Sequence, residues 1–108
     1  MIGEGGKALR KYPQTMPYTS DFIARVRNQP RTQLGTRLAL WAIYHNISVT
    51  KIAKAVGATR QSVYNWMNGN GVLHVYEDRL NRLLNCMQNS KTSDEAWKKI
   101  CTEFNLRT

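Results

Sequence analysis

Apolar residues recur at spacings of three and four along most of the chain after residue 18, which is the period of an amphipathic α-helix. Clusters of Gly, Pro and Asn interrupt this pattern and divide it into several short helices. A short helix should begin at Thr19 or Ser20 and end near Pro30. The other helices are expected over 32–45, 49–55, 59–68, 76–87 and about a dozen residues after Thr92. The pattern therefore predicts an all-α fold, a compact bundle of five to six helices.

The longest of the early helices should supply much of the core. Its apolar residues form a stripe at helical spacing, made of Leu34, Leu38, Trp41 and Ala42. We expect Trp41 to lie in the core and not to stack on a ligand. Arg31 and Arg37 lie outside this stripe, where each can either reach a phosphate or remain solvated.

Residues 48–69 stand out because they predict two short helices joined by a tight turn. Gly57 interrupts the apolar pattern, and glycine adopts the left-handed conformation that such a turn needs. Ser48 and Thr59 precede the two helices, where a side-chain oxygen can accept a hydrogen bond from a free backbone N–H. Ala53 is small where two crossing helices come closest. These features together predict a helical hairpin.

The second helix of this hairpin has one apolar and one polar face. Its apolar face contains Val63, Trp66 and Met67, and its polar side has no carboxylate. Amide and guanidinium groups are suited to the major groove, where Gln and Asn pair with adenine and Arg with guanine. Between residues 48 and 73 the charged residues are all basic, namely Lys51, Lys54 and Arg60. The residues thus indicate contact with DNA, while an ordinary helical hairpin with a polar surface remains the alternative.

The hairpin resembles the helix-turn-helix of the Cro and repressor type, the Xre-like regulators of phages and prokaryotes. The residues that carry the resemblance are Ile52, Ala53, Val56, Gly57, Val63 and Trp66, followed by Asn68-Gly69. It implies that helix 59–68 enters the major groove. Its expected base contacts are Arg60, Gln61 and Asn65, with Tyr64 as a further candidate. The expected contacts to the DNA backbone are Thr50, Lys51, Thr59, Ser62, Asn68 and Asn70.

Charge and length are consistent with a single domain that binds a polyanion. The chain has 108 residues and a formal net charge of +9, and its isoelectric point is near 10.0. We expect residues 1–18 to form a flexible basic arm, which either enters the minor groove or contacts nothing. Residues 19–90 should form the DNA-binding domain, and 91–108 a C-terminal helix.

The C-terminal helix has its own apolar stripe, which comprises Trp97, Ile100, Cys101 and Phe104. This stripe should either fold back on the domain or pair with the same stripe of a second copy. We favour the second possibility, a homodimer, because small DNA-binding modules gain affinity and site length when they act in pairs.

Other classes of function find little support in the sequence. Cys86 and Cys101 fit reduced core thiols, and His45 and His74 stand apart from any metal-ligand pattern. We expect no cofactor, no metal, no membrane segment and no enzymatic activity, and a location in the bacterial cytoplasm or nucleoid. The expected function is a DNA-binding transcriptional regulator, most plausibly a repressor. The alternatives are a DNA-packaging or replication module and an adaptor that docks on RNA polymerase.

Overall fold

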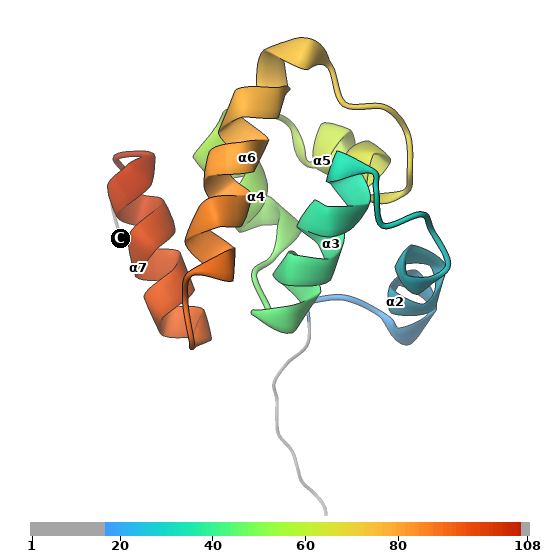
Figure 1. Cartoon of the computed structure of the whole chain (residues 1–108), viewed down its shortest axis with the longest axis horizontal. Helices are drawn as coiled ribbons and strands as arrows, with labels where there is room; N and C mark the ends of the chain where they lie inside the picture. Colours follow the sequence, from blue (N-terminus) through green and yellow to red (C-terminus); the bar gives the residue numbers. More distant parts are fainter. Residues whose placement is uncertain (1–16, 107–108) are drawn as a thin grey trace, which may run out of the picture.

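The computed structural model describes residues 17–106, and these residues form helices and loops without a strand (Figure 1). The all-α prediction is therefore confirmed. The helices are α2 (Ser20–Arg27), α3 (Leu34–Tyr44), α4 (Val49–Val56), α5 (Arg60–Met67), α6 (His74–Gln88) and α7 (Ser93–Glu103).

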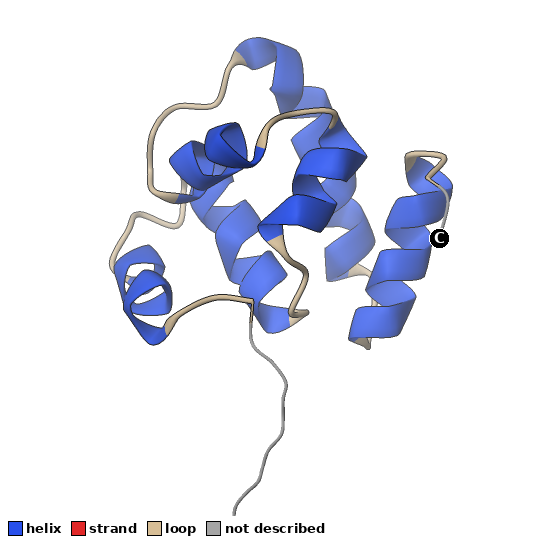
Figure 2. Cartoon of the chain, turned by 180° about the vertical axis from the view of Figure 1, so that it is seen from behind, coloured by secondary structure: helices blue, strands red, loops and turns tan. Residues whose placement is uncertain are grey.

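The helices surround one apolar core. Helices α3 and α6 pack together in the middle, with α2 beyond α3 at one end and α7 beyond α6 at the other (Figure 1). Seen from behind, α4 and α5 come to the front (Figure 2). The largest side chains with almost no exposed area come from all six of these helices, and include Val26, Leu38, Ile52, Val63, Met67, Leu80, Leu84 and Ile100.

The predicted ends of the hairpin helices are confirmed to within a residue. Thr59 precedes α5, and its side chain accepts a hydrogen bond from the backbone N–H of Ser62. Ser48 caps α4 in the same way. Gly57 ends α4 in the left-handed conformation, with φ of +74°, where a side chain would be strained. These features depend on neighbouring residues in the chain, which is why the sequence alone predicts them.

Two helix starts differ from the prediction. Helix α3 begins at Leu34 and not at residue 32, because Pro30 is followed by a turn in which the Gln33 N–H bonds to the Pro30 carbonyl. Helix α6 begins at His74 and not at residue 76, although Leu73 has no side chain that can cap it. The apolar pattern does not include these first residues, since Val75 and His74 are exposed.

Helices α3 and α5 approach each other so closely that their backbones nearly touch. A Cβ atom built on Gly35 would lie 2.0 Å from the carbonyl oxygen of Trp66. Every residue except glycine would therefore push the two helices apart. This contact fixes α5, the predicted DNA-contacting helix, directly on the central helix of the bundle.

The folded domain begins before the predicted boundary at residue 19. Tyr18 is buried, its ring stacks on Phe22, and its hydroxyl donates a hydrogen bond of 2.6 Å to the carbonyl of Ile47. The prediction that the arm extends to residue 18 is wrong for this residue, because an isolated tyrosine between Pro17 and Thr19 gives no periodic signal. Residues 1–16 of the predicted arm lie outside the described residues.

Trp41 packs against the core, as predicted, but it is only partly buried. Its ring stacks on His45, with ring centroids 5.8 Å apart. His45 takes the buried position, and its Nε2 lies 2.8 Å from the carbonyl oxygen of Met87. The apolar pattern missed this arrangement because a histidine that bonds to a distant carbonyl is not distinguishable in the sequence from an exposed one.

Helix α7 folds back on the domain. Ala96, Ile100 and Cys101 are buried, and α7 packs mainly on α6. The two partly buried aromatic rings of the stripe lie under cations, since Lys51 Nζ is 4.9 Å from the Trp97 centroid and Arg82 Cζ is 5.0 Å from that of Phe104. The stripe that suggested a dimer is therefore largely covered within one chain.

Candidate nucleic-acid interface

The polar side of α5 is open to solvent, as predicted. Val63, Trp66 and Met67 are buried against the core. The predicted contact residues of this helix and its ends are exposed or half-buried, namely Thr59, Arg60, Gln61, Ser62, Tyr64, Asn65, Asn68 and Asn70. All eight residues are therefore at least partly accessible on α5 or at its ends.

Gln61 and Asn65 form a hydrogen-bonded pair on this surface. The Gln61 Nε2 donates to Asn65 Oδ1 over 3.0 Å, the geometry that residues four apart on a helix allow. Gln61 then keeps its Oε1 acceptor and one N–H donor, and Asn65 keeps both of its N–H donors. Exchanging the two amide orientations likewise leaves an acceptor and several donors free. Adenine presents one donor and one acceptor in the major groove, whereas guanine presents two acceptors. The pair can therefore offer adenine both an acceptor and a donor.

The hydroxyls at the start of α5 have unequal freedom to contact a phosphate. Thr59 accepts from the Ser62 N–H at 3.0 Å, and its own hydroxyl donates to Ser62 Oγ at 3.0 Å. Thr59 is thus occupied in capping the helix, while the Ser62 hydroxyl keeps its hydrogen for another acceptor. Ser62 is the better phosphate donor of the two.

Tyr64 is held by α2 and is not fully free to face a base. The Tyr64 ring contacts the Phe22 ring edge to face, with ring centroids 6.0 Å apart. Tyr64 as a whole is 38% exposed. Tyr18 lies nearby, and burial together with Tyr64 raises the pKa of the Tyr18 phenol. The three rings attach α2 to the side of α5, a contact that the sequence did not predict.

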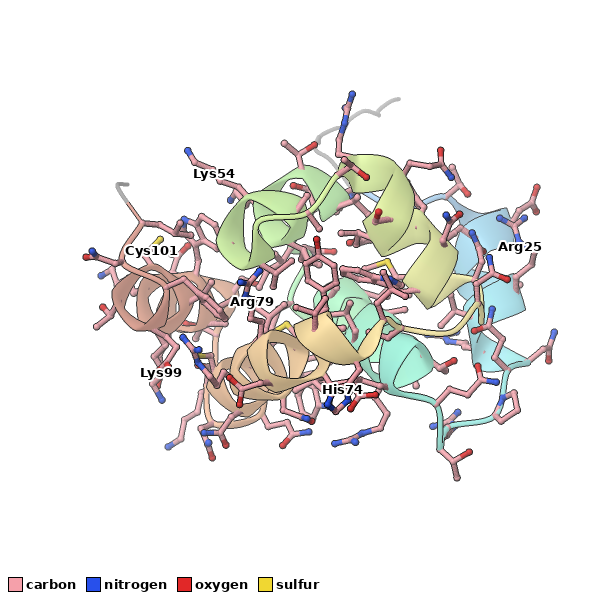
Figure 3. All side chains as sticks on the ribbon, turned by 90° about the horizontal axis from the view of Figure 1, so that it is seen from above. Arg25, Lys54, His74, Arg79, Lys99 and Cys101 are labelled. Carbon is pink, nitrogen blue, oxygen red and sulfur yellow. The ribbon has the colours of Figure 1, made fainter. Side chains whose placement is uncertain are left out.

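The predicted contacts on α4 are divided between two sides of the helix. Thr50 is exposed, but the ammonium of Lys51 lies over Trp97 and so faces α7. Lys54 projects from α4 into solvent, on the opposite side of α5 from Arg25 of α2 (Figure 3). Lys54 and Arg25 therefore flank α5, although neither was among the predicted contact residues.

Arg79 of α6 supports the turn between α4 and α5. Its guanidinium donates to the carbonyl of Val56 at 3.0 Å and lies over the ring of Tyr76 (Figure 3). Val56 is the last residue of α4, so Arg79 satisfies a carbonyl that the helix itself leaves free. The apolar pattern gives no sign of this role of Arg79, because it depends on a contact across 23 residues.

Charge is distributed unevenly along the chain and therefore over the bundle. Residues 17–73, which contain α2 to α5, include seven basic residues and one acidic residue. Residues 74–106, which contain α6 and α7, include five of each. Several of these form ion pairs, such as Arg82 with Glu103 at 3.0 Å and Lys99 with Glu95 at 3.2 Å. The positive side of the molecule is the one that carries α5.

Residues 17–106 contain neither a metal-ligand cluster nor a helix that could span a membrane. This part of the chain contains no group of three or more His, Cys, Asp and Glu side chains that can hold a metal ion. Its helices are all too short or too polar to span a bilayer. Cys86 and Cys101 are buried and unpaired with each other, and burial raises the pKa of the Cys86 thiol.

Comparisons with known proteins gave no further indication of function. No family model matches the chain, and neither the curated proteins nor the solved structures compared with it gave a match. The resemblance to Cro-type and repressor-type regulators stays a prediction that rests on the hairpin residues.

Proposed function

We propose that this protein is a sequence-specific DNA-binding regulator of transcription that inserts α5 into the major groove of double-stranded DNA. The observation that carries the proposal is the Gln61–Asn65 pair, which lies exposed on a helix without a carboxylate. The free amide groups of this pair can offer a donor and an acceptor to the edge of a base. The basic side of the bundle supplies attraction to phosphates.

In this mechanism the residues around the pair have separate tasks. Arg60 contacts a second base, Ser62 and Thr50 contact phosphates at the start of the two helices, and Asn68 and Asn70 contact the backbone where α5 ends. Gly35 and Arg79 hold the hairpin in place from behind. The protein represses transcription when the bound site overlaps a promoter, which requires no cofactor.

A selection from a random pool of DNA duplexes tests the proposal. We expect a preferred site that contains an adenine opposite the Gln61–Asn65 pair. Gln61→Ala and Asn65→Ala should each lower discrimination at that base pair by about 1–3 kcal/mol. Asn81→Ala, which removes an exposed amide from α6, is the matched control and should leave the preference unchanged.

The same experiment separates the proposal from its alternatives. Unchanged preference in both the Gln61 and the Asn65 variants would contradict the assignment of the pair to base contacts. Absence of binding even to random duplex at low salt would favour an adaptor that docks on a protein, since a charge of +9 should give nonspecific affinity.

Pairing of two copies on the DNA remains part of the proposal, although the C-terminal stripe no longer argues for a homodimer of the free protein. A selected site with two symmetric halves about 10 base pairs apart indicates two copies on one face of the DNA. A single asymmetric site indicates a monomer. A ring of many subunits in solution would instead indicate a DNA-packaging module.

A further inference from the structure

A groove lies between α2 and the side of α5, and its α2 wall was not among the predicted DNA contacts. Its walls include Thr19 and Arg25 from the start and the end of α2, and Tyr64 and Asn68 from α5. The space measures about 240 Å³ and opens to solvent. A guanidinium, an amide and two hydroxyls therefore gather beside the helix that contacts DNA in the proposed function.

The chemistry of this groove suits a phosphate. Among the described residues, none that lines it is acidic, and Asp21, the acidic residue of α2, is not part of its walls. Arg25 Cζ lies 5.8 Å from the centroid of the Phe22 ring, so that an aromatic ring supports the guanidinium. Arginine is the side chain best matched to phosphate oxygens, and the amide of Asn68 adds a donor.

The groove lies on the side of α5 that would face one of the two strands of a bound duplex. Lys54 of α4 and Arg25 of α2 lie on opposite sides of α5 (Figure 3). The major groove is about 12 Å wide and has a phosphate backbone on each side. A helix seated in it therefore meets one strand on its α4 side and the other on its α2 side.

We propose that this groove between α2 and α5, through Arg25, binds a backbone phosphate of the DNA strand opposite to the one contacted by α4. This proposal rests on the DNA-binding function proposed above and extends the interface to α2. The contact between Phe22 and Tyr64 sets the spacing of the two sites, because it fixes α2 against α5. Arg25 supplies affinity without sequence information, as contacts to phosphates do.

Binding of duplex DNA at several salt concentrations tests this role. Arg25→Ala should weaken binding to the selected site and to random duplex alike, roughly tenfold at low salt. It should also lower the slope of log affinity against log salt by about one. Arg27→Ala is the matched control, because Arg27 is an exposed arginine of the same helix that does not line the groove. Arg25→Lys keeps the charge and should keep most of the slope.

Phosphate ethylation interference on the selected site locates the contact. In the wild-type protein we expect interference on both strands, with Arg25→Ala removing it from one strand and Lys54→Ala from the other. If Arg25→Ala binds like Arg27→Ala, or loses interference on the same strand as Lys54→Ala, the inference is wrong although the protein binds DNA. If the wild-type protein binds no duplex at all, the proposed function is wrong and the inference with it.

Discussion

Gly35 shows how a single absent side chain determines where α5, the helix proposed to contact DNA, lies. The backbone of α3 at Gly35 lies almost in contact with the backbone carbonyl of Trp66. A methyl group at this position has no space, since the obstructing atom belongs to the backbone of α5 and not to a flexible side chain. The packing of the two helices thus depends on this one residue.

We expect Gly35→Ala to destabilise the protein by about 1–3 kcal/mol, the usual range for an overpacked core. The better helix propensity of alanine, about 1 kcal/mol, offsets part of this cost. Chemical denaturation measures the difference. Gly71→Ala is the control, because a Cβ there meets nothing within 4 Å, and its effect should remain within about 0.5 kcal/mol. Equal stability of the two variants would show that α3 and α5 have room to separate.

At the scale of the element, two arginines one helical turn apart on α6 have different tasks. Arg79 donates to the carbonyl at the end of α4. Arg82 forms ion pairs with Asp78 and Glu103, whose hydrogen bonds and charges raise the pKa of its guanidinium. The first arginine satisfies a helix end, and the second forms exposed ion pairs.

Arg79→Ala should lower the free energy of unfolding by about 1 kcal/mol, the typical value of one hydrogen bond. That loss should persist at high salt, since its acceptor is a neutral carbonyl. The loss from Arg82→Ala should shrink as salt rises, because salt screens exposed ion pairs. Denaturation of both variants in low and high salt checks this difference. A loss in Arg79→Ala that disappears at high salt would mean that its hydrogen bond does not support the turn.

The elements themselves were largely predictable, whereas their contacts were not. Gly57 and Thr59 are recognisable because caps and turns depend on residues a few positions apart. The exposed face of α5 was predictable in the same way, from the helical spacing of its apolar residues. By contrast, the position of α2 beside Tyr64 depends on tertiary packing across about 40 residues, which no local pattern encodes. Arg25 was missed for that reason, and Lys51 was assigned to DNA although Trp97 attracts it.

At the scale of the whole molecule, α7 belongs to the same cooperative body as the rest of the bundle. Ile100 has no exposed area, although the helix that carries it is the last of the described residues. Its burial against α6 means that the bundle does not need a partner subunit to cover this stripe.

Ile100→Ala should therefore lower the free energy of unfolding by about 2–5 kcal/mol, as other buried truncations do. The unfolding midpoint should not change over a roughly hundredfold range of protein concentration, since mass action affects only associating chains. Lys98→Ala, at an exposed position of the same helix, is the control and should have little effect. A wild-type midpoint that rises with concentration would show that a second copy covers the stripe.

The uneven charge of the bundle gives the molecule an electric dipole moment. Its positive end contains α2 to α5, and its neutral end contains α6 and α7. In the field of a nucleic acid such a molecule experiences a torque before it makes any contact, so that collisions occur preferentially with α5 in front. Electrostatic steering of this kind raises association rates and weakens steeply with ionic strength. The acidic residues of the last two helices would thus contribute to the speed of the encounter, although they lie away from the surface proposed to meet the duplex.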